Sequence, residues 1–141
     1  MNAYTAPLRD LRFALHDVLD IQSFYAALPG SESVTRELAD AVLEEGARFV
    51  EQVLAPLYQS ADAEGCHFDP SDGSVRTPDG FKAAFGQWVE NGWGGLTAPE
   101  AYGGQQLPET LGSAIKEMVD AANLAWGNYP LLSHGAPEAL L

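Results

Sequence analysis

The sequence predicts an all-α fold, a helical bundle. Apolar residues recur every three or four positions along several segments, and the connections between these segments are short and rich in Gly and Pro. The strand–helix alternation that builds a nucleotide-binding parallel sheet is missing from the pattern. A chain of 141 residues, 46% of them hydrophobic and 19% charged, has the size and composition of an ordinary globular domain.

The first thirty residues predict a helical extension. Pro7 suits the first position of a helix, because its missing N–H would have no partner there in any case. The apolar stripe that follows consists of Leu8, Leu11, Leu15, Val18 and Leu19. A second short segment, residues 21–28, is closed by Pro29 and Gly30. We therefore expect residues 1–30 to form an extension and residues 31–141 to form the main helical domain.

The longest helix is expected to begin at Ser33, a residue type that caps helix N-termini. Its buried face is predicted to comprise Val34, Leu38, Val42, Phe49, Val53 and Leu57, widened by Leu43, Val50 and Leu54. Pro56 cannot donate the hydrogen bond that the carbonyl of Gln52 would accept. We therefore expect a kink or an end at this proline.

A small β-hairpin is expected within residues 66–76, because the turn formers of residues 69–73 (Asp-Pro-Ser-Asp-Gly) separate two short segments. Thr77 is expected to cap the next helix, with Pro78 at its first position. The predicted buried side of that helix comprises Phe81, Phe85, Trp88 and Val89. Asn91 and Gly92 are expected to end it.

Residues 92–104 predict a loop, because they include five glycines and one proline. A further helix is expected from Pro108 to about Ala125, and a last helical segment from near Tyr129 to Leu141. The final residues are strong helix formers without a Gly or Asn cap. This pattern favours a chain whose boundary lies inside a helix, and we expect it to be the first third or less of a longer protein.

The charge pattern argues against two classes of partner. The net charge is −13, from 20 acidic and seven dispersed basic residues, whereas nucleic acids and anionic membranes require clusters of Lys and Arg. Apolar runs stay well short of the ~20 residues of a membrane span, and residues 9–10 (Arg-Asp) interrupt any signal peptide. Cys66, the single cysteine, has no partner for an intrachain disulfide. We expect a cytoplasmic protein.

The order of residues in the loop at 92–104 resembles the loop between two helices in the N-terminal domain of acyl-CoA dehydrogenases. In that family a Gly-Leu segment leads to Pro, an acidic residue, an aromatic residue and Gly-Gly. Further segments resemble one bacterial branch with an N-terminal extension, in the same order and spacing: residues 4–13, 53–57, 61–66 and 77–81. That branch includes enzymes for long-chain acyl-CoAs and for 3-methylmercaptopropionyl-CoA, and the resemblance covers nearly the whole chain.

The resemblance implies an FAD-dependent oxidoreductase as the parent protein. Enzymes of this family remove a proton from the substrate α-carbon and pass a hydride from the β-carbon to flavin N5. The catalytic glutamate lies in a C-terminal helical bundle, and FAD is held mainly by the middle and C-terminal domains. We therefore expect no catalytic, cofactor-binding or metal-binding residue in this chain, and no FAD bound to the chain alone. An acyl-CoA substrate, electron-transfer flavoprotein and a homo-oligomer are the partners implied for the parent.

The residues themselves offer weaker candidates for chemistry. The glycine pairs of the loop lack the motif of a phosphate-binding turn, and we interpret them as turn residues. Glu100 is expected to cap a backbone turn rather than act as a base. His16, His67 and His134 are too dispersed for a metal motif. Residues 69–73 resemble a calcium loop, but the Gly comes one place early and the closing glutamate is missing.

The resemblance places an acyl-chain pocket along the last helices. Carried onto this chain, its lining residues are Met118, Ala122, Trp126, Tyr129 and Leu132. An acyl tail is recognised by its buried area, at roughly 0.8 kcal/mol per methylene, and small residues such as Ala122 leave room for it. Taken from the residues alone, each of the five is equally well explained as part of an ordinary core.

Two functional hypotheses follow. The first is the N-terminal domain of an FAD-dependent acyl-CoA dehydrogenase, which walls the acyl pocket and is not catalytic alone. The alternative is a free-standing helical interaction or lipid-binding module that kept the fold without the chemistry. The two differ over Leu131, Leu132, Leu140 and Leu141, which a domain cut from its parent exposes and a complete module covers.

Overall fold

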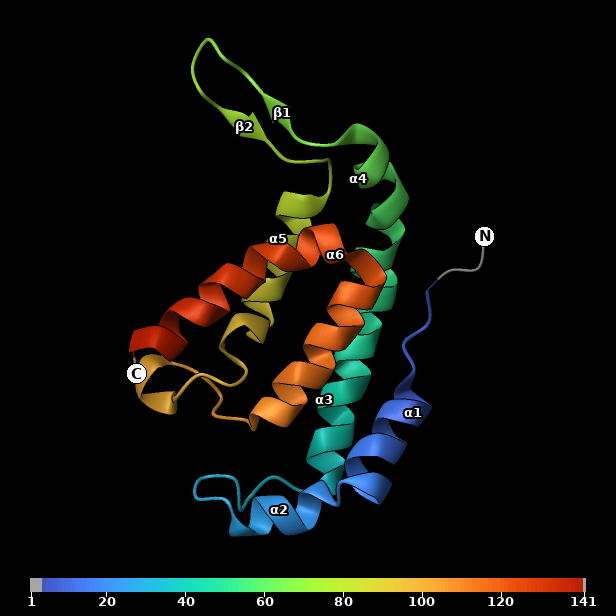
Figure 1. Ribbon diagram of the computed structural model, residues 1–141, viewed down its shortest axis with the longest axis vertical. Helices are drawn as coiled ribbons and strands as arrows, with labels where there is room; N and C mark the ends of the chain where they lie inside the picture. Colours follow the sequence, from blue (N-terminus) through green and yellow to red (C-terminus); the bar gives the residue numbers. More distant parts are fainter. Residues whose placement is uncertain (1–3, 141) are drawn as a thin grey trace.

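A computed structural model describes the backbone of residues 4–140 and the side chains of residues 4–136. Helices α3 and α6 form the centre of the bundle, the C-terminal half of α6 crosses α5, and the hairpin projects from one end (Figure 1). The expected helical bundle with one small hairpin is confirmed. The helices and strands are α1 (Leu8–Arg12), α2 (Ile21–Ala27), α3 (Arg36–Phe49), α4 (Tyr58–Glu64), β1 (His67–Phe68), β2 (Val75–Arg76), α5 (Phe81–Glu90) and α6 (Glu109–Leu140).

The first helix begins at Leu8, one residue later than predicted, because Pro7 is its N-cap and not its first residue. It continues from α1 into a π-helical turn, Phe13–Val18. Val18 and Leu19 were predicted on its buried stripe, and this was wrong, because both are exposed. The π-turn explains the error: the N–H of Leu19 donates to the carbonyl of Ala14, five residues back, so the helical period shifts within this turn. Of the predicted stripe, only Leu11 and Leu15 are buried.

Helix α3 begins two residues later than predicted. Thr35, not Ser33, is the N-cap, and its hydroxyl oxygen accepts a hydrogen bond of 3.2 Å from the N–H of Leu38. Leu38, predicted on the buried face, is exposed, whereas Leu43 and Val50 form the centre of that face. The approach of α6 selects this face.

Gly46 permits that approach. A Cβ at this position would lie 2.3 Å from Cδ1 of Ile115 on α6, so the two helices meet where α3 has no side chain. The periodicity of large apolar residues does not register a glycine as part of a buried face, and the predicted face was rotated for this reason.

Pro56 interrupts the long helix, as predicted. After α3 the chain forms a π-helical turn, Val50–Leu54, then a tight turn at Ala55–Leu57, and only then α4. The predicted hairpin is also confirmed, with His67 opposite Arg76 and Phe68 opposite Val75. Its turn is closed by carboxylates: Asp69 and Asp72 each accept a 2.8 Å hydrogen bond from the N–H two residues on.

Helix α5 begins at Phe81, behind an N-cap at Gly80, so the predicted cap at Thr77 and start at Pro78 were wrong. The N–H of Asp79 donates instead to Glu64 of α4 over 2.9 Å, which holds the chain outside the helix. Gly80 has a φ of 87°, a conformation that favours glycine. The predicted end at Asn91 and Gly92 is confirmed.

The predicted buried side of α5 is correct for Phe81 and Trp88, which are buried. It was wrong for Phe85 and Val89, which are exposed. The buried stripe of this helix consists of Phe81, Ala84 and Trp88, at spacings of three and four residues, and Phe85 and Val89 lie outside it.

Helix α6 is two helical arms joined at a kink. Asn123 has φ −162° and ψ 83°, which no helix contains, so the break lies earlier than the predicted gap between Ala125 and Tyr129. We name residues 109–122 the first arm and residues 124–140 the second arm. The first arm runs beside α3, and the second arm turns back across α5 toward the loop before α6 (Figure 1). The side chain of Leu140, and Leu141 altogether, lie outside the described residues.

The N-terminal extension shares the core of the main domain. Leu11, Leu15 and Ile21 belong to the same buried cluster as α3 and the first arm, and the hydroxyl of Tyr25 bonds that of Thr110. The division at residue 30 therefore stays a prediction. Within the described residues, no helix combines the length and the apolar character needed to cross a bilayer.

A polar clamp fastens the extension to α3. Asp40 accepts hydrogen bonds of 3.0 Å from the guanidinium of Arg12 and from the buried imidazole of His16, and Arg12 also pairs with Glu44. Burial raises the pKa of Asp40, but the hydrogen bonds from His16 and Arg12 outweigh this effect, so the pKa lies below its ordinary value. The clamp thus stabilises the charged carboxylate.

Asp40→Asn is expected to lower the free energy of unfolding by about 1–2 kcal/mol at neutral pH, since two donors lose a charged acceptor. The pKa of Asp40 is lower in the folded protein than its ordinary value of about 3.9, so this stability is complete above about pH 4 and is lost as the pH falls through the folded pKa. In urea unfolding the gap between variant and wild type should therefore narrow below about pH 4.

Asp10→Asn removes an equal charge from an exposed position of α1 and is the control, with an expected change within about 0.5 kcal/mol. Equal stability of Asp40→Asn and wild type at neutral pH would contradict the clamp.

Candidate functional site

The glycine-rich loop before α6 is held by its own backbone. Two tight turns, Trp93–Gly95 and Glu100–Tyr102, are joined by cross-bonds in which Gln105, Gln106 and Leu107 donate to the loop's carbonyls over 2.9–3.0 Å. Five further N–H groups of the loop, at residues 95, 96, 102, 103 and 104, donate to carbonyls within it as well. These amides close turns and have no proton left for a phosphate, which supports the interpretation of the glycines as turn residues.

Gly104 allows two segments of the loop backbone to come into contact. A Cβ there would lie 2.0 Å from the carbonyl oxygen of Ala98 and 2.4 Å from its carbonyl carbon, both of them backbone atoms. Glu100 contributes its backbone, since its carbonyl accepts from the N–H of Gly103 over 2.9 Å. Its side chain is exposed and makes no turn-capping hydrogen bond in the described residues, so the predicted capping role of the carboxylate was wrong.

An apolar cavity of about 260 Å³ lies between the two arms of α6, α5 and the glycine-rich loop. Its apolar wall comprises Phe85, Trp88, Val89, Trp93, Leu96, Ile115, Val119, Pro130 and Leu131. Two ion pairs stand at its rim, Lys116 with Asp120 and, at 3.9 Å, His134 with Glu109. The lining is mainly apolar and therefore suits an aliphatic group, while Oδ1 of Asp120 is buried there without a hydrogen-bond partner in the described residues.

Sequence reasoning missed most of this cavity, and Gly127 is the signal that marks it. A Cβ at Gly127 would lie 2.6 Å from an oxygen of Asp120 and 3.2 Å from Cγ1 of Val119, so the glycine lets the second arm fold against the first. A glycine inside an otherwise helical pattern indicates either a weakened helix or a close approach of another segment to the helix backbone. Only the kink at Asn123 reveals which of the two applies.

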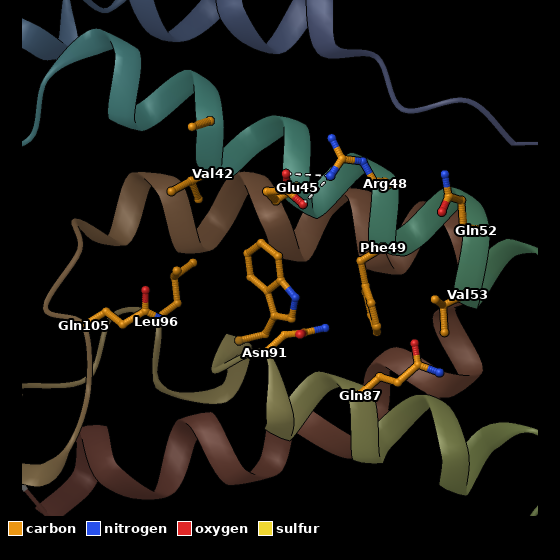
Figure 2. Close-up of a pocket in the computed structure, with 12 residues that line it drawn as sticks. Val42, Glu45, Arg48, Phe49, Gln52, Val53, Gln87, Asn91, Leu96 and Gln105 are labelled. Carbon is orange, nitrogen blue, oxygen red and sulfur yellow. Dashed lines mark hydrogen bonds and ion pairs between the residues drawn. The ribbon is translucent and has the colours of Figure 1, made fainter.

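A second cavity, of about 470 Å³, lies between α3, α5 and the glycine-rich loop (Figure 2). Its walls combine apolar side chains with the carboxamides of Gln52, Gln87, Asn91 and Gln105. The charged residues of this wall pair with each other, since Arg48 donates to both oxygens of Glu45 over 2.6 and 2.7 Å (Figure 2). This cavity can form hydrogen bonds but offers no paired acid and base for proton transfer.

The sequence that forms the loop and the arms matches a known protein family. The family model of the acyl-CoA dehydrogenase N-terminal domain matches residues 36–138. The chain belongs to the acyl-CoA dehydrogenase family. The predicted resemblance is thereby confirmed, from the start of α3 into the second arm.

Individual relatives agree. The chain is 38% identical over 137 residues to 3-methylmercaptopropionyl-CoA dehydrogenase of Ruegeria pomeroyi, which covers 97% of this chain. It is 32% identical over 127 residues, 89% of its length, to the broad-specificity linear acyl-CoA dehydrogenase FadE5 of Mycobacterium tuberculosis. A butyryl-CoA dehydrogenase of Syntrophomonas wolfei is 27% identical over 146 residues, covering 97% of this chain. The chain spans only 20–24% of the length of these relatives.

The two cavities described above are lined by other residues than the five predicted for the acyl pocket. Met118, Ala122 and Trp126 are buried in the core. A Cβ at Gly46 of α3 would lie 3.2 Å from Cε of Met118, and Trp126 packs among the aromatic rings of α3 and α5. These three side chains pack the kinked helix into the core of the domain.

Tyr129 and Leu132 lie on the second arm, away from that core. The Tyr129 ring meets Phe81 edge-on at 5.9 Å, and its hydroxyl lies 4.0 Å from Sγ of Cys66. Burial, followed by the neighbouring thiol, raises the pKa of Tyr129. Leu132 is 79% exposed, the largest exposed fraction among the described large apolar side chains. The assignment of all five to the acyl pocket stays a prediction.

The histidines and the cysteine lie apart, as their spacing predicts. His16 bonds Asp40, His67 lies 3.9 Å from Glu64, and His134 lies near Glu109. In the described part of the chain, no three side chains among His, Cys, Asp and Glu gather closely enough to hold a metal ion. Cys66 is exposed and free.

Gly104→Ala is expected to destabilise this domain by about 1–3 kcal/mol, because the added methyl group meets backbone atoms that have little freedom to move. Gly86→Ala is the matched control: nothing lies within 4 Å of a Cβ there, and the helical position should gain about 0.5–1 kcal/mol. Thermal and urea unfolding measure both. A neutral Gly104→Ala would mean that the loop is not tightly closed at Ala98.

Proposed function

We propose that this chain is the N-terminal domain of a longer FAD-dependent acyl-CoA dehydrogenase. The family match over residues 36–138 carries the proposal, and the similarity to two relatives named as acyl-CoA dehydrogenases supports it. The parent enzyme would remove the α-proton of an acyl-CoA thioester and transfer the β-hydride to the flavin. Its base and most of its flavin site would lie in the part of the relatives that this chain does not span.

The contribution of this domain would be an apolar wall for the acyl tail. The second arm presents Leu124, Tyr129 and Leu132 outward, and the cavity between the arms adds an apolar recess behind them. Because an acyl tail is bound by area, at roughly 0.8 kcal/mol per buried methylene, a wall without unpaired charges is what it requires. Met118, Ala122 and Trp126 would act by holding that wall in place.

The turns of the glycine-rich loop and the wall of the second cavity are poorly suited to the diphosphate of FAD. A diphosphate needs free N–H groups or cations, whereas the amides that close the turns already donate to loop carbonyls and Arg48 is paired with Glu45. The flavin of the parent would therefore be held elsewhere. Electron-transfer flavoprotein as the oxidant, a homo-oligomeric state and a cytoplasmic location belong to the same proposal.

The substrate class within this proposal is an acyl-CoA thioester with an uncharged tail. A methylthio-substituted chain and a simple linear chain present similar apolar surfaces, and the names of the two relatives include one of each. The alternative function, a free-standing interaction or lipid-binding module, gains no support from the comparisons. The exposure of Leu131 and Leu132 also favours a domain that packs against further protein.

The test is to express the longest reading frame that contains this chain. We expect a yellow protein whose flavin absorbance is bleached by an acyl-CoA and restored by an electron acceptor. A colourless product, or a flavin that no acyl-CoA of any chain length bleaches, would refute the proposal.

Within that enzyme, Leu132→Trp should lower kcat/KM for long acyl-CoAs about tenfold more than for short ones, because the bulk is added to the exposed wall. Ala122→Phe should shorten the preferred chain only by shifting the arm, and it should cost about 1–3 kcal/mol of stability through overpacking. Chain-length profiles and melting curves measured together separate the two effects. An unchanged profile in both variants would remove the second arm from the acyl site.

A further inference from the structure

Asn123 lies at the kink of α6 and is buried, with 1% of its surface exposed. Its side-chain oxygen accepts a hydrogen bond of 3.1 Å from the N–H of Trp126, three residues on. This is the geometry of an N-cap, so the second arm begins as a new helix capped by Asn123. The NH2 group of the same side chain carries two protons, which also need hydrogen-bond acceptors when the group is buried.

The amide nitrogen of Asn123 donates to the backbone carbonyl of Leu54 over 3.2 Å. Leu54 ends the π-helical turn that follows α3, directly before the turn that contains Pro56. One buried side chain thus links the irregular turn after α3 to the kink of α6, across 69 positions of sequence. Because both groups lie in the dry core, loss of either leaves an unpaired polar atom there.

Two buried hydrogen bonds hold the beginning of the second arm. Asn123 ties its beginning to the turn after α3, and the indole N–H of Trp126 donates to the carbonyl of Phe81 on α5 over 3.3 Å. Beyond Trp126 the arm is mostly exposed, so packing alone holds it weakly. A change in the first attachment would pivot the arm about the second and move Tyr129 and Leu132 together.

We infer that Asn123 is a positioning residue whose bond to the carbonyl of Leu54 sets the direction of the second arm, and thereby the acyl chain length that the parent enzyme prefers. The second half of this inference rests on the proposed function, while the first half concerns this chain alone. Two experiments separate them.

The first experiment measures the arm in the 141-residue chain. Spin labels are placed at Glu37→Cys on α3 and Leu132→Cys on the second arm, in a Cys66→Ser background, and their distance distribution is recorded. Asn123→Ser keeps an N-capping oxygen but is too short and lacks the amide to reach Leu54, so it should shift or broaden the distribution, as should Asn123→Ala. Leu43→Ala, a cavity in α3 away from the kink, is the control for general destabilisation.

Distributions that match wild type in both Asn123 variants would overturn the inference, whatever the parent enzyme does. A shift in Leu43→Ala equal to theirs would overturn it as well, since the effect would then follow stability and not the bond.

The second experiment measures kcat/KM of the full-length enzyme for short and long acyl-CoAs. Asn123→Ser should change the ratio of the two values about tenfold, and Leu43→Ala should leave the ratio unchanged even at an equal loss of melting temperature. A uniform loss across chain lengths in Asn123→Ser would refute the role in specificity. A wild-type enzyme inactive with every acyl-CoA would instead refute the proposed function, and the spin-label distances would still decide whether Asn123 directs the arm.

Discussion

The burial of Trp126 is the interaction on which the arrangement of the helices depends. Its ring has no exposed surface and lies 5.6 Å from Trp88 of α5, 6.1 Å from Phe49 of α3 and 6.3 Å from Phe85. Its indole N–H donates a hydrogen bond to the carbonyl of Phe81 on α5, as a buried indole N–H needs an acceptor. Losing such a side chain typically costs about 3–5 kcal/mol, a large share of the stability of a domain of this size. Three helices from distant parts of the sequence meet at this one ring.

Two interrupted helices are linked next to Trp126. The π-turn after α3, the proline that follows it and the kink of α6 each interrupt a helix, and the amide of Asn123 joins two of these interruptions. An interrupted helix leaves backbone N–H and C=O groups without partners. A buried carboxamide can bond one of each, because its oxygen accepts from an N–H and its nitrogen donates to a C=O. The polar groups that the kink leaves free therefore have hydrogen-bond partners, and these bonds fix the direction of the second arm.

In the proposed function this domain contributes apolar area, and the catalytic groups would come from the rest of the enzyme. Its charged side chains pair with one another at the rims of both cavities, and its glycine-rich loop uses its amides to hold its own turns. An apolar wall of this kind suits the tail of a thioester, while proton and hydride transfer require groups that the rest of an acyl-CoA dehydrogenase would supply. Family membership and local geometry thus agree on a supporting role for these residues.

Local chemistry in the sequence determined which segments are helical, where Pro56 breaks the long helix, where the hairpin turns and where Gly92 ends α5, because each depends on residues within a few positions. Tertiary contacts decided the rest. The start of α5 depends on Glu64 holding Asp79, the buried face of α3 on the approach of α6 at Gly46, and the kink on a carbonyl 69 residues away. Met118 and Trp126 went to the core for the same reason: periodicity identifies an apolar face, but only the packed partner determines whether that face meets another helix or a ligand.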